Sequence, residues 1–158
     1  MQKGTPTAGG NQASNSSIGV GGNVGTIIVE EGARLDGRIY SNNAKINKIE
    51  VNGNIGVGGS NSSIINFNGT HINTIEIGKN AVLQGKIFNT HYNNLGPSSG
   101  NSIISNINIQ GSVHSLDNQS GTMSNVQITN GGKVNNGISN SGTMNTIQIT
   151  NGGSVGGT

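Results

Sequence analysis

The stretch Thr122–Gly137 (TMSNVQITNGGKVNNG) returns 21 positions later as Thr143–Thr158 (TMNTIQITNGGSVGGT). Aligning the two gives nine identities in sixteen positions, and most of the remaining exchanges are between small or polar residues. Such agreement indicates an internal repeat, and repeats of about 20 to 50 residues are typical of solenoid proteins. The repetition therefore decides the fold.

Looser copies of the same unit extend toward the N-terminus. Its centre is a pair of β-branched residues flanking one other residue, and a further apolar residue stands three positions upstream. Alternation of this kind is typical of short β-strands. The centres are Ile27–Val29, Ile49–Val51, Ile75–Ile77, Ile107–Ile109, Val126–Ile128 and Ile147–Ile149, so successive copies begin 22, 26, 32, 19 and 21 residues apart.

The chain contains 28 Gly and 27 Asn, and these residues separate the apolar runs. Both residue types suit sharp corners because they tolerate positive φ. One coil cannot bury its apolar edge alone, whereas stacked coils pair each strand with its equivalent about 4.8 Å away. We predict an all-β fold with almost no helix, a parallel β-helix of about six coils, right-handed as parallel connections usually are.

This β-helix is expected to span residues 18–158 as a single domain. Residues 1–17 are predicted to be a polar, disordered lead-in. Two stretches lengthen their coils, near 54–69 and near 89–102, and we interpret them as loop insertions, because insertions in solenoids fall in loops that often form the binding face.

The composition excludes several classes of partner. Hydrophobic residues make up 30% and charged residues 9% of the chain, against about 45–50% and about 25% in an average domain. The net charge is +2, without a basic cluster of the kind that binds phosphates, so neither nucleic acid nor an anionic membrane is an expected partner. No apolar run approaches the roughly 20 residues of a membrane-spanning helix.

The residues give little support to catalysis, and we predict no enzyme, catalytic residue, metal or cofactor. The chain has no cysteine, and its three histidines are scattered. The letters GPSSG (Gly96–Gly100) match a nucleophile elbow, but that motif needs a strand-to-helix turn that is not expected here. Glu50 and Glu76 occupy the same repeat position and are predicted to stack outward, with Lys45, Lys48 and Lys79 as neighbours in an ion-pair ladder.

The repeats resemble the passenger domains of bacterial autotransporters, including those of the vacuolating-cytotoxin style. The resemblance is clearest in Asn118–Thr158 and looser in TIIVEEGARLDGRI (Thr26–Ile39) and TIEIGKNAVLQGKI (Thr74–Ile87). It implies a right-handed β-helix displayed at the bacterial cell surface or secreted across the outer membrane, with roles in adhesion and virulence. The protease-type motif GDSGS is absent, and so is the β-barrel translocator, which suggests a passenger fragment.

We therefore expect an adhesin or autoaggregation scaffold that binds through its polar walls and loops. The candidate contact loop is His91, Tyr92, Asn93 and Asn94. Expected partners are other copies of the chain, a host or bacterial surface protein, or a glycan. Two alternatives stay open: a fragment of a carbohydrate-active β-helix enzyme, and a polymerising scaffold similar to the bactofilins, which EEGARLDGRI (Glu30–Ile39) resembles.

Overall fold

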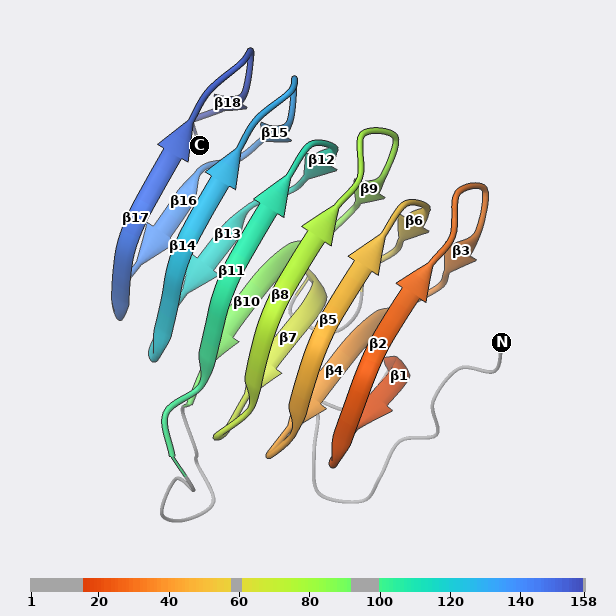
Figure 1. Ribbon diagram of the computed structural model, residues 1–158, viewed down its shortest axis with the longest axis vertical. Coiled ribbons are helices and arrows are strands. Elements are labelled where there is room, and N and C mark those ends of the chain that lie inside the picture. Colours follow the sequence, from red (N-terminus) through yellow and green to blue (C-terminus); the bar gives the residue numbers. More distant parts are fainter. Residues whose placement is uncertain (1–15, 58–60, 92–99, 158) are drawn as a thin grey trace.

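A computed structural model describes residues 16–57, 61–91 and 100–157. The chain forms a parallel β-solenoid of six coils, and each coil contributes one strand to each of three sheets (Figure 1). Neither α-helix nor antiparallel pairing occurs in the described ranges. The predicted all-β parallel architecture, with about six coils, is confirmed.

Each of the three sheets contains six strands, one from each coil. Sheet A consists of β1 (Ser16–Val20), β4 (Arg38–Asn42), β7 (Ser62–Phe67), β10 (Lys86–Thr90), β13 (Leu116–Asn118) and β16 (Ile138–Asn140). Sheet B consists of β2 (Asn23–Val29), β5 (Lys45–Val51), β8 (His71–Ile77), β11 (Ile103–Ile109), β14 (Thr122–Ile128) and β17 (Thr143–Ile149). Sheet C consists of β3 (Arg34–Leu35), β6 (Asn54–Ile55), β9 (Val82–Leu83), β12 (Ser112–Val113), β15 (Lys133–Val134) and β18 (Ser154–Val155).

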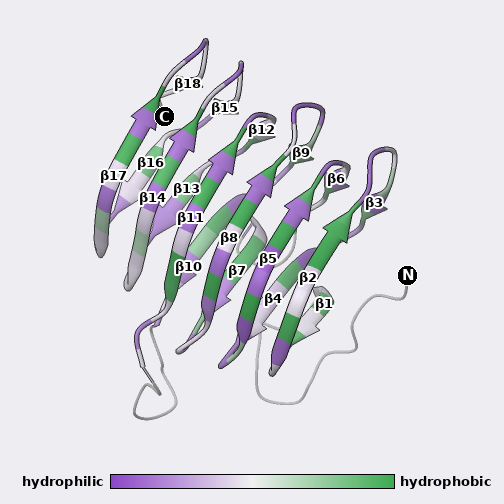
Figure 2. Cartoon of the chain, in the orientation of Figure 1, coloured by the Kyte–Doolittle hydropathy of each residue, from purple (hydrophilic) through white to green (hydrophobic). Residues whose placement is uncertain are grey.

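The apolar positions of the repeat form continuous columns inside the solenoid. In sheet B, Ile49 is in register with Ile75, and Ile75 with Ile107. All three side chains are buried. Figure 2 shows the same alternation of apolar and polar residues along the strands of sheet B. Burying apolar surface stabilises the fold by about 25 cal/mol per Å². These side chains are buried by the coils on either side of them, which explains why one coil could not fold alone.

Asn-Gly pairs form several of the corners, as predicted. Asn130 has φ 51° and Gly131 has φ 81°, and Asn151 and Gly152 repeat this with 48° and 77°. Positive φ at two successive residues is the signature of a type I′ turn, which Asn-Gly adopts more readily than other pairs. The repeated TNGG is thus a turn sequence in both coils.

The corners between sheets B and C have two lengths. Four residues make the corner at 30–33, 78–81, 129–132 and 150–153, and two residues make it at 52–53 and 110–111. In Figure 1 the longer corners rise as loops ahead of β3, β9, β15 and β18. The first five coils therefore alternate long and short at this edge.

Glycine is required at the short corners because a long corner lies directly over each of them. A Cβ added to Gly111 would lie 2.3 Å from the carbonyl oxygen of Gly78 and 2.5 Å from that of Ala81. At Gly53 the same position would be 2.3 Å from Ala33 O and 2.4 Å from Glu30 O. Real side chains never approach backbone oxygens so closely, so each short corner depends on its glycine.

A column of buried asparagines runs inside sheet A. Asn66 Nδ2 donates to Asn89 Oδ1 (2.7 Å), Asn89 Nδ2 donates to Asn118 Oδ1 (2.8 Å), and Asn118 Nδ2 donates to Asn140 Oδ1 (2.7 Å). The first three side chains are buried. Asn89 Nδ2 also lies within hydrogen-bonding distance of the Ser102 carbonyl oxygen (3.2 Å). We call these four residues the asparagine ladder, and the sequence analysis did not predict it.

Two equivalent isoleucines provide a test of coil stacking. Ile128 is fully buried under the following coil, whereas Ile149 occupies the same repeat position in the last coil and is 48% exposed. We expect Ile128→Ala to lower the free energy of unfolding by about 3–4 kcal/mol, and Ile149→Ala to cost about 1–2 kcal/mol, because less apolar surface is lost. Urea unfolding followed by circular dichroism measures both. Equal losses would contradict the stacking argument.

The predicted lead-in and insertions are only partly described. Of residues 1–17, Ser16 and Ser17 belong to β1 and the others lie outside the described ranges. Within 54–69 the structure describes 54–57 and 61–69, which include β6 and β7. The second stretch, 89–102, connects sheet A to sheet B between β10 and β11. The strands of sheet B keep a length of seven residues in all six coils.

Candidate functional site: the outer face of sheet B

Sheet B has the longest strands of the three sheets, with seven residues in each. In each of its strands the second, fifth and seventh residues point into the core, and the first, third, fourth and sixth point outward, as the burial pattern of β8 illustrates. Because the strands are parallel and in register, equivalent outward residues form rows along the solenoid axis. We call this surface the outer face of sheet B.

Side chains within the rows are hydrogen-bonded from coil to coil. Asn73 Nδ2 donates to Asn47 Oδ1 (3.4 Å), and Asn125 Nδ2 donates to Asn106 Oδ1 (3.2 Å). In a third row, Gln127 Nε2 donates to Gln148 Oε1 (3.3 Å). These bonds fix exposed amides in position, so the rows are more ordered than ordinary surface side chains.

Charge on this face is concentrated on β5 and β8. Lys48 Nζ lies 2.9 Å from a carboxylate oxygen of Glu50 and 2.9 Å from one of Glu76. Glu50 and Glu76 are in register on adjacent coils, as predicted, and Lys48 is the lysine that bridges them. Its hydrogen bonds to Glu76 and then Glu50 raise the pKa of Lys48. The pKa of Glu50 is lowered, first by the hydrogen bond from Lys48 and then by that from Asn52.

Replacing Lys48 with methionine should raise the pKa of Glu50 toward its ordinary value, because the variant lacks the main donor to the carboxylate. A carboxyl with a lowered folded-state pKa stabilises the fold above its unfolded pKa of about 4.3, and loses that contribution as the pH falls through the folded value. The stability difference between wild type and variant should therefore shrink in acid. Carbon NMR titration of Glu50 measures the pKa, with Lys133→Met as control. An unchanged titration would refute the bridge.

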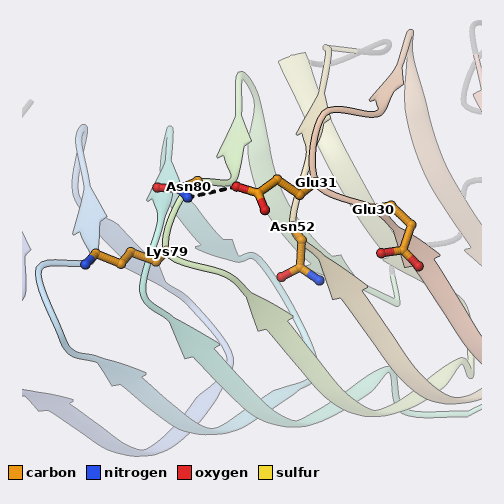
Figure 3. A pocket seen from close by; sticks show the side chains of 5 residues that line it. All are labelled: Glu30, Glu31, Asn52, Lys79 and Asn80. Carbon is orange, nitrogen blue, oxygen red and sulfur yellow. Dashed lines mark hydrogen bonds between the residues drawn. The ribbon is translucent and has the colours of Figure 1, made fainter.

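A notch lies at the edge of sheet B, where the short corner of the second coil is flanked by two longer ones. It is lined by Glu30, Glu31, Asn52, Lys79 and Asn80 and has a volume of about 240 Å³ (Figure 3). Asn80 Nδ2 donates to Glu31 Oε1 (3.0 Å), which ties the first coil to the third. The notch thus follows from the alternation of corner lengths, and sequence reasoning missed it because the alternation is visible only once the strands are aligned.

The outer face of sheet A differs from that of sheet B in carrying aromatic rings. Tyr40 and Phe67 stack with centroids 6.2 Å apart, and Lys86 Nζ lies 4.5 Å from the centroid of Phe88. Lys86 is also paired with Asp117 at 2.9 Å. Burial raises the pKa of Tyr40, and the nearby Arg38 opposes the rise. Every aromatic side chain in the described ranges lies on this sheet.

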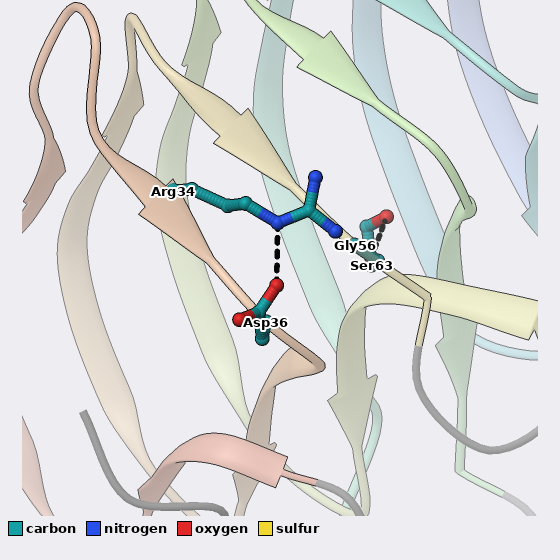
Figure 4. Close-up of polar contacts among 4 residues, drawn as sticks. All are labelled: Arg34, Asp36, Gly56 and Ser63. Carbon is teal, nitrogen blue, oxygen red and sulfur yellow. Dashed lines mark hydrogen bonds and ion pairs between the residues drawn. The ribbon is translucent and has the colours of Figure 1, made fainter.

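Polar contacts near sheet C serve the fold. Ser63 Oγ donates to the Gly56 carbonyl (2.7 Å) and accepts from the Gly85 backbone N–H (2.8 Å), which ties β7 to the residue after β6 and to the next coil. Arg34 pairs with Asp36 on the same coil, and both side chains are exposed (Figure 4). We assign no chemistry to either contact.

The histidines do not converge. His71 Nε2 lies 2.9 Å from Ser105 Oγ, and the His114 ring lies 3.0 Å from Asn136 Nδ2. His91, the first residue of the predicted contact loop, follows β10, and its backbone N–H donates to Ser120 Oγ (2.8 Å). Tyr92, Asn93 and Asn94 lie outside the described residues, as does most of the GPSSG stretch.

Searches for metal ligands and membrane spans add no further site. Among the residues with described positions, no group of three or more His, Asp or Glu side chains is placed to hold a metal ion. No helix in that part of the chain is both long and apolar enough to span a bilayer.

Comparison with known proteins gives no relative: no family model, curated protein or solved structure matches the chain significantly. The class of the protein therefore rests on its own architecture. Stacked parallel coils built from a sequence repeat define a β-helical repeat protein.

Proposed function

We propose that this chain is a non-enzymatic adhesive scaffold of a bacterial surface or secreted protein, similar in role to an autotransporter passenger. The observation that carries the proposal is the outer face of sheet B, where polar side chains predominate from β5 to β17 and three pairs of amides are hydrogen-bonded between neighbouring coils. A broad face of ordered amides suits binding to another surface, because each fixed side chain has less conformational freedom to lose on contact.

The carboxylates support a binding role over a catalytic one. Glycoside hydrolysis uses two carboxyl groups on either side of the bond that breaks. Glu50 and Glu76 share one row on the same side of the sheet, and Lys48 forms an ion pair with each of them. We propose that they are an ion-pair ladder of the wall. Release of reducing sugars from any polysaccharide would overturn this part of the proposal.

The proposed partners are another copy of the chain, a surface protein of host or bacterium, or a glycan. The predicted contact loop is proposed as a second contact region, since its first residue, His91, follows the end of β10 and donates its backbone N–H to Ser120 Oγ. Neither nucleic acid nor a lipid bilayer is a proposed partner, because the outer face of sheet B carries two lysines, Lys45 and Lys48, balanced by two glutamates, Glu50 and Glu76, and no basic stripe.

The test compares matched pairs of substitutions on two faces. Beads coated with the whole chain are scored for clustering and for retention on bacterial cells, host cells and glycan arrays. We expect Asn73→Lys with Asn125→Lys, on sheet B, to reduce binding. We expect Asn54→Lys in β6 with Asn135→Lys, which directly follows β15, to leave binding unchanged. All four side chains are exposed. If the wild type binds to nothing, or the two variants lose binding equally, the proposal is wrong.

A further inference from the structure

Charge divides the outer face of sheet B into two halves. β5 and β8 carry Lys45, Lys48, Glu50 and Glu76, whereas the outward residues of the last three strands include no Lys, Arg, Asp or Glu. We call the latter surface the neutral half. Its outward residues are Ile103, Ser105, Asn106 and Asn108 on β11, Thr122, Ser124, Asn125 and Gln127 on β14, and Thr143, Asn145, Thr146 and Gln148 on β17.

A shallow groove runs along the neutral half. It has a volume of about 340 Å³ and reaches from Thr74 on β8 to Thr146 on β17. Two amide rows form its sides: Asn106 and Asn125 in one, Asn108 and Gln127 in the other. The hydrogen bonds of Asn125 to Asn106 and of Gln127 to Gln148 hold these rows parallel to the solenoid axis. The surface therefore has ridges that run along the axis, and the side chains within each ridge recur at a fixed spacing.

From this arrangement we infer that the neutral half docks face to face on the neutral half of a second copy of the chain. This inference rests on the proposed adhesive function and names the partner. The side chains of each row recur about every 4.8 Å along the axis, so rows of a second copy that lie parallel to them repeat at the same interval along the whole contact. Amides carry both donors and acceptors, so identical rows can bond to each other.

Charge explains why the contact ends at β8. Burying the Lys48 ion pairs would remove three charged groups from water, and the desolvation of ions commonly exceeds what their pairing returns. Burying the neutral half removes no ion from water. When two identical copies meet through it, no like charges repel each other. The charged strands therefore mark the border of the docking surface.

The same face is poorly suited to a sugar polymer. Glycans gain much of their binding from stacking on aromatic rings, and the described aromatic side chains Tyr40, Phe67 and Phe88 all lie on sheet A. A glycan that uses the neutral half would have to bind through amides and hydroxyls alone. A second copy needs nothing more, because its own rows supply the matching groups.

A single contact is expected to be weak. Three strands of seven residues, at about 3.3 Å per residue and about 4.8 Å per strand, cover roughly 330 Å². Stable interfaces cover about 800 Å² per partner. Adhesion by this face thus requires many copies on each surface, where avidity multiplies weak contacts.

The experiment uses charge exchange on beads that carry many copies of the whole chain. Gln127→Lys beads and Gln127→Glu beads should each cluster about tenfold less than wild type, since like charges then oppose each other in the contact. Mixing the two kinds of bead should restore clustering, because opposite charges now meet. The matched control is Gln84→Lys, an exposed glutamine on the sheet C side, which should cluster as wild type does.

Each outcome decides between the explanations. Clustering of Gln127→Lys beads at the wild-type level would overturn self-docking through the neutral half while leaving the adhesive function intact. Failure of the mixed beads to cluster would overturn the face-to-face arrangement. Wild-type beads that do not cluster but bind to a glycan array through Gln127 would assign the face to sugars. Wild-type beads that bind to nothing would refute the proposed function itself.

Discussion

Replacing Gly111 with alanine is expected to lower the free energy of unfolding by about 3 kcal/mol, the upper part of the usual range for overpacking. The added Cβ would stand 2.3 Å from Gly78 O and 2.5 Å from Ala81 O. Both obstacles are backbone atoms of the preceding coil, so neither can be relieved by rotation of a side chain. The corner must move, and its hydrogen bonds to the neighbouring coil are then strained, among them Gln110 N–H to Ile77 O (2.8 Å).

Gly25→Ala is the matched control, because nothing lies within 4 Å of the Cβ position and φ at Gly25 is not in the left-handed range. That change should alter stability by no more than about 0.5 kcal/mol, or slightly increase it by restricting the unfolded chain. Urea unfolding of the two variants gives the comparison. If Gly111→Ala were as stable as Gly25→Ala, the long corner would not constrain the short one.

Replacing Asn89 with leucine is expected to cost about 3–4 kcal/mol, since each buried polar group left without a partner costs roughly 1–3 kcal/mol. Asn89 is fully buried in the middle of the asparagine ladder. Its Oδ1 accepts from Asn66, and its Nδ2 donates to Asn118 Oδ1. Leucine preserves the volume but leaves a donor on one side and an acceptor on the other unsatisfied.

The control for the ladder is Asn145→Ala, at an exposed position of β17, which should change stability by less than about 0.5 kcal/mol. Thermal and urea unfolding can be compared for both variants. Amide hydrogen exchange adds a local measurement: protection should fall in β7 and β13, which flank Asn89 in sheet A. A leucine variant as stable as wild type would show that the ladder contributes nothing beyond filling space.

Much of the fold could be predicted because its determinants are periodic. The β-branched pairs, such as Val126 with Ile128, identify inward positions of sheet B, and the TNGG pairs identify the corners. The ladder was missed because asparagine is so common in this chain that single residues carry no signal. A pattern did exist: each ladder residue ends an apolar-x-Asn triplet, as in Ile64–Asn66, Ile87–Asn89, Leu116–Asn118 and Ile138–Asn140.

The candidate site was less accessible to prediction. The shared register of Glu50 and Glu76 could be inferred from the repeat, whereas the choice of Lys48 as the bridge depends on side-chain reach. The rows of the outer face required the alignment of all six strands. The alignment is difficult to infer from the sequence because the spacing between repeats varies. The strands of sheet B nevertheless all have seven residues.

The asparagine ladder also supplies a way to detect misalignment. The other interior columns are mostly Ile, Val and Leu, and a strand displaced by two residues would still place one aliphatic side chain against another. In sheet A the same displacement would set an amide against Ile64 or Ile87, and a buried amide without a partner is costly. All ladder amides donate in one direction, from each coil to the next. Each correctly placed coil therefore presents the acceptor that the coil before it needs, and alignment errors are penalised as they arise.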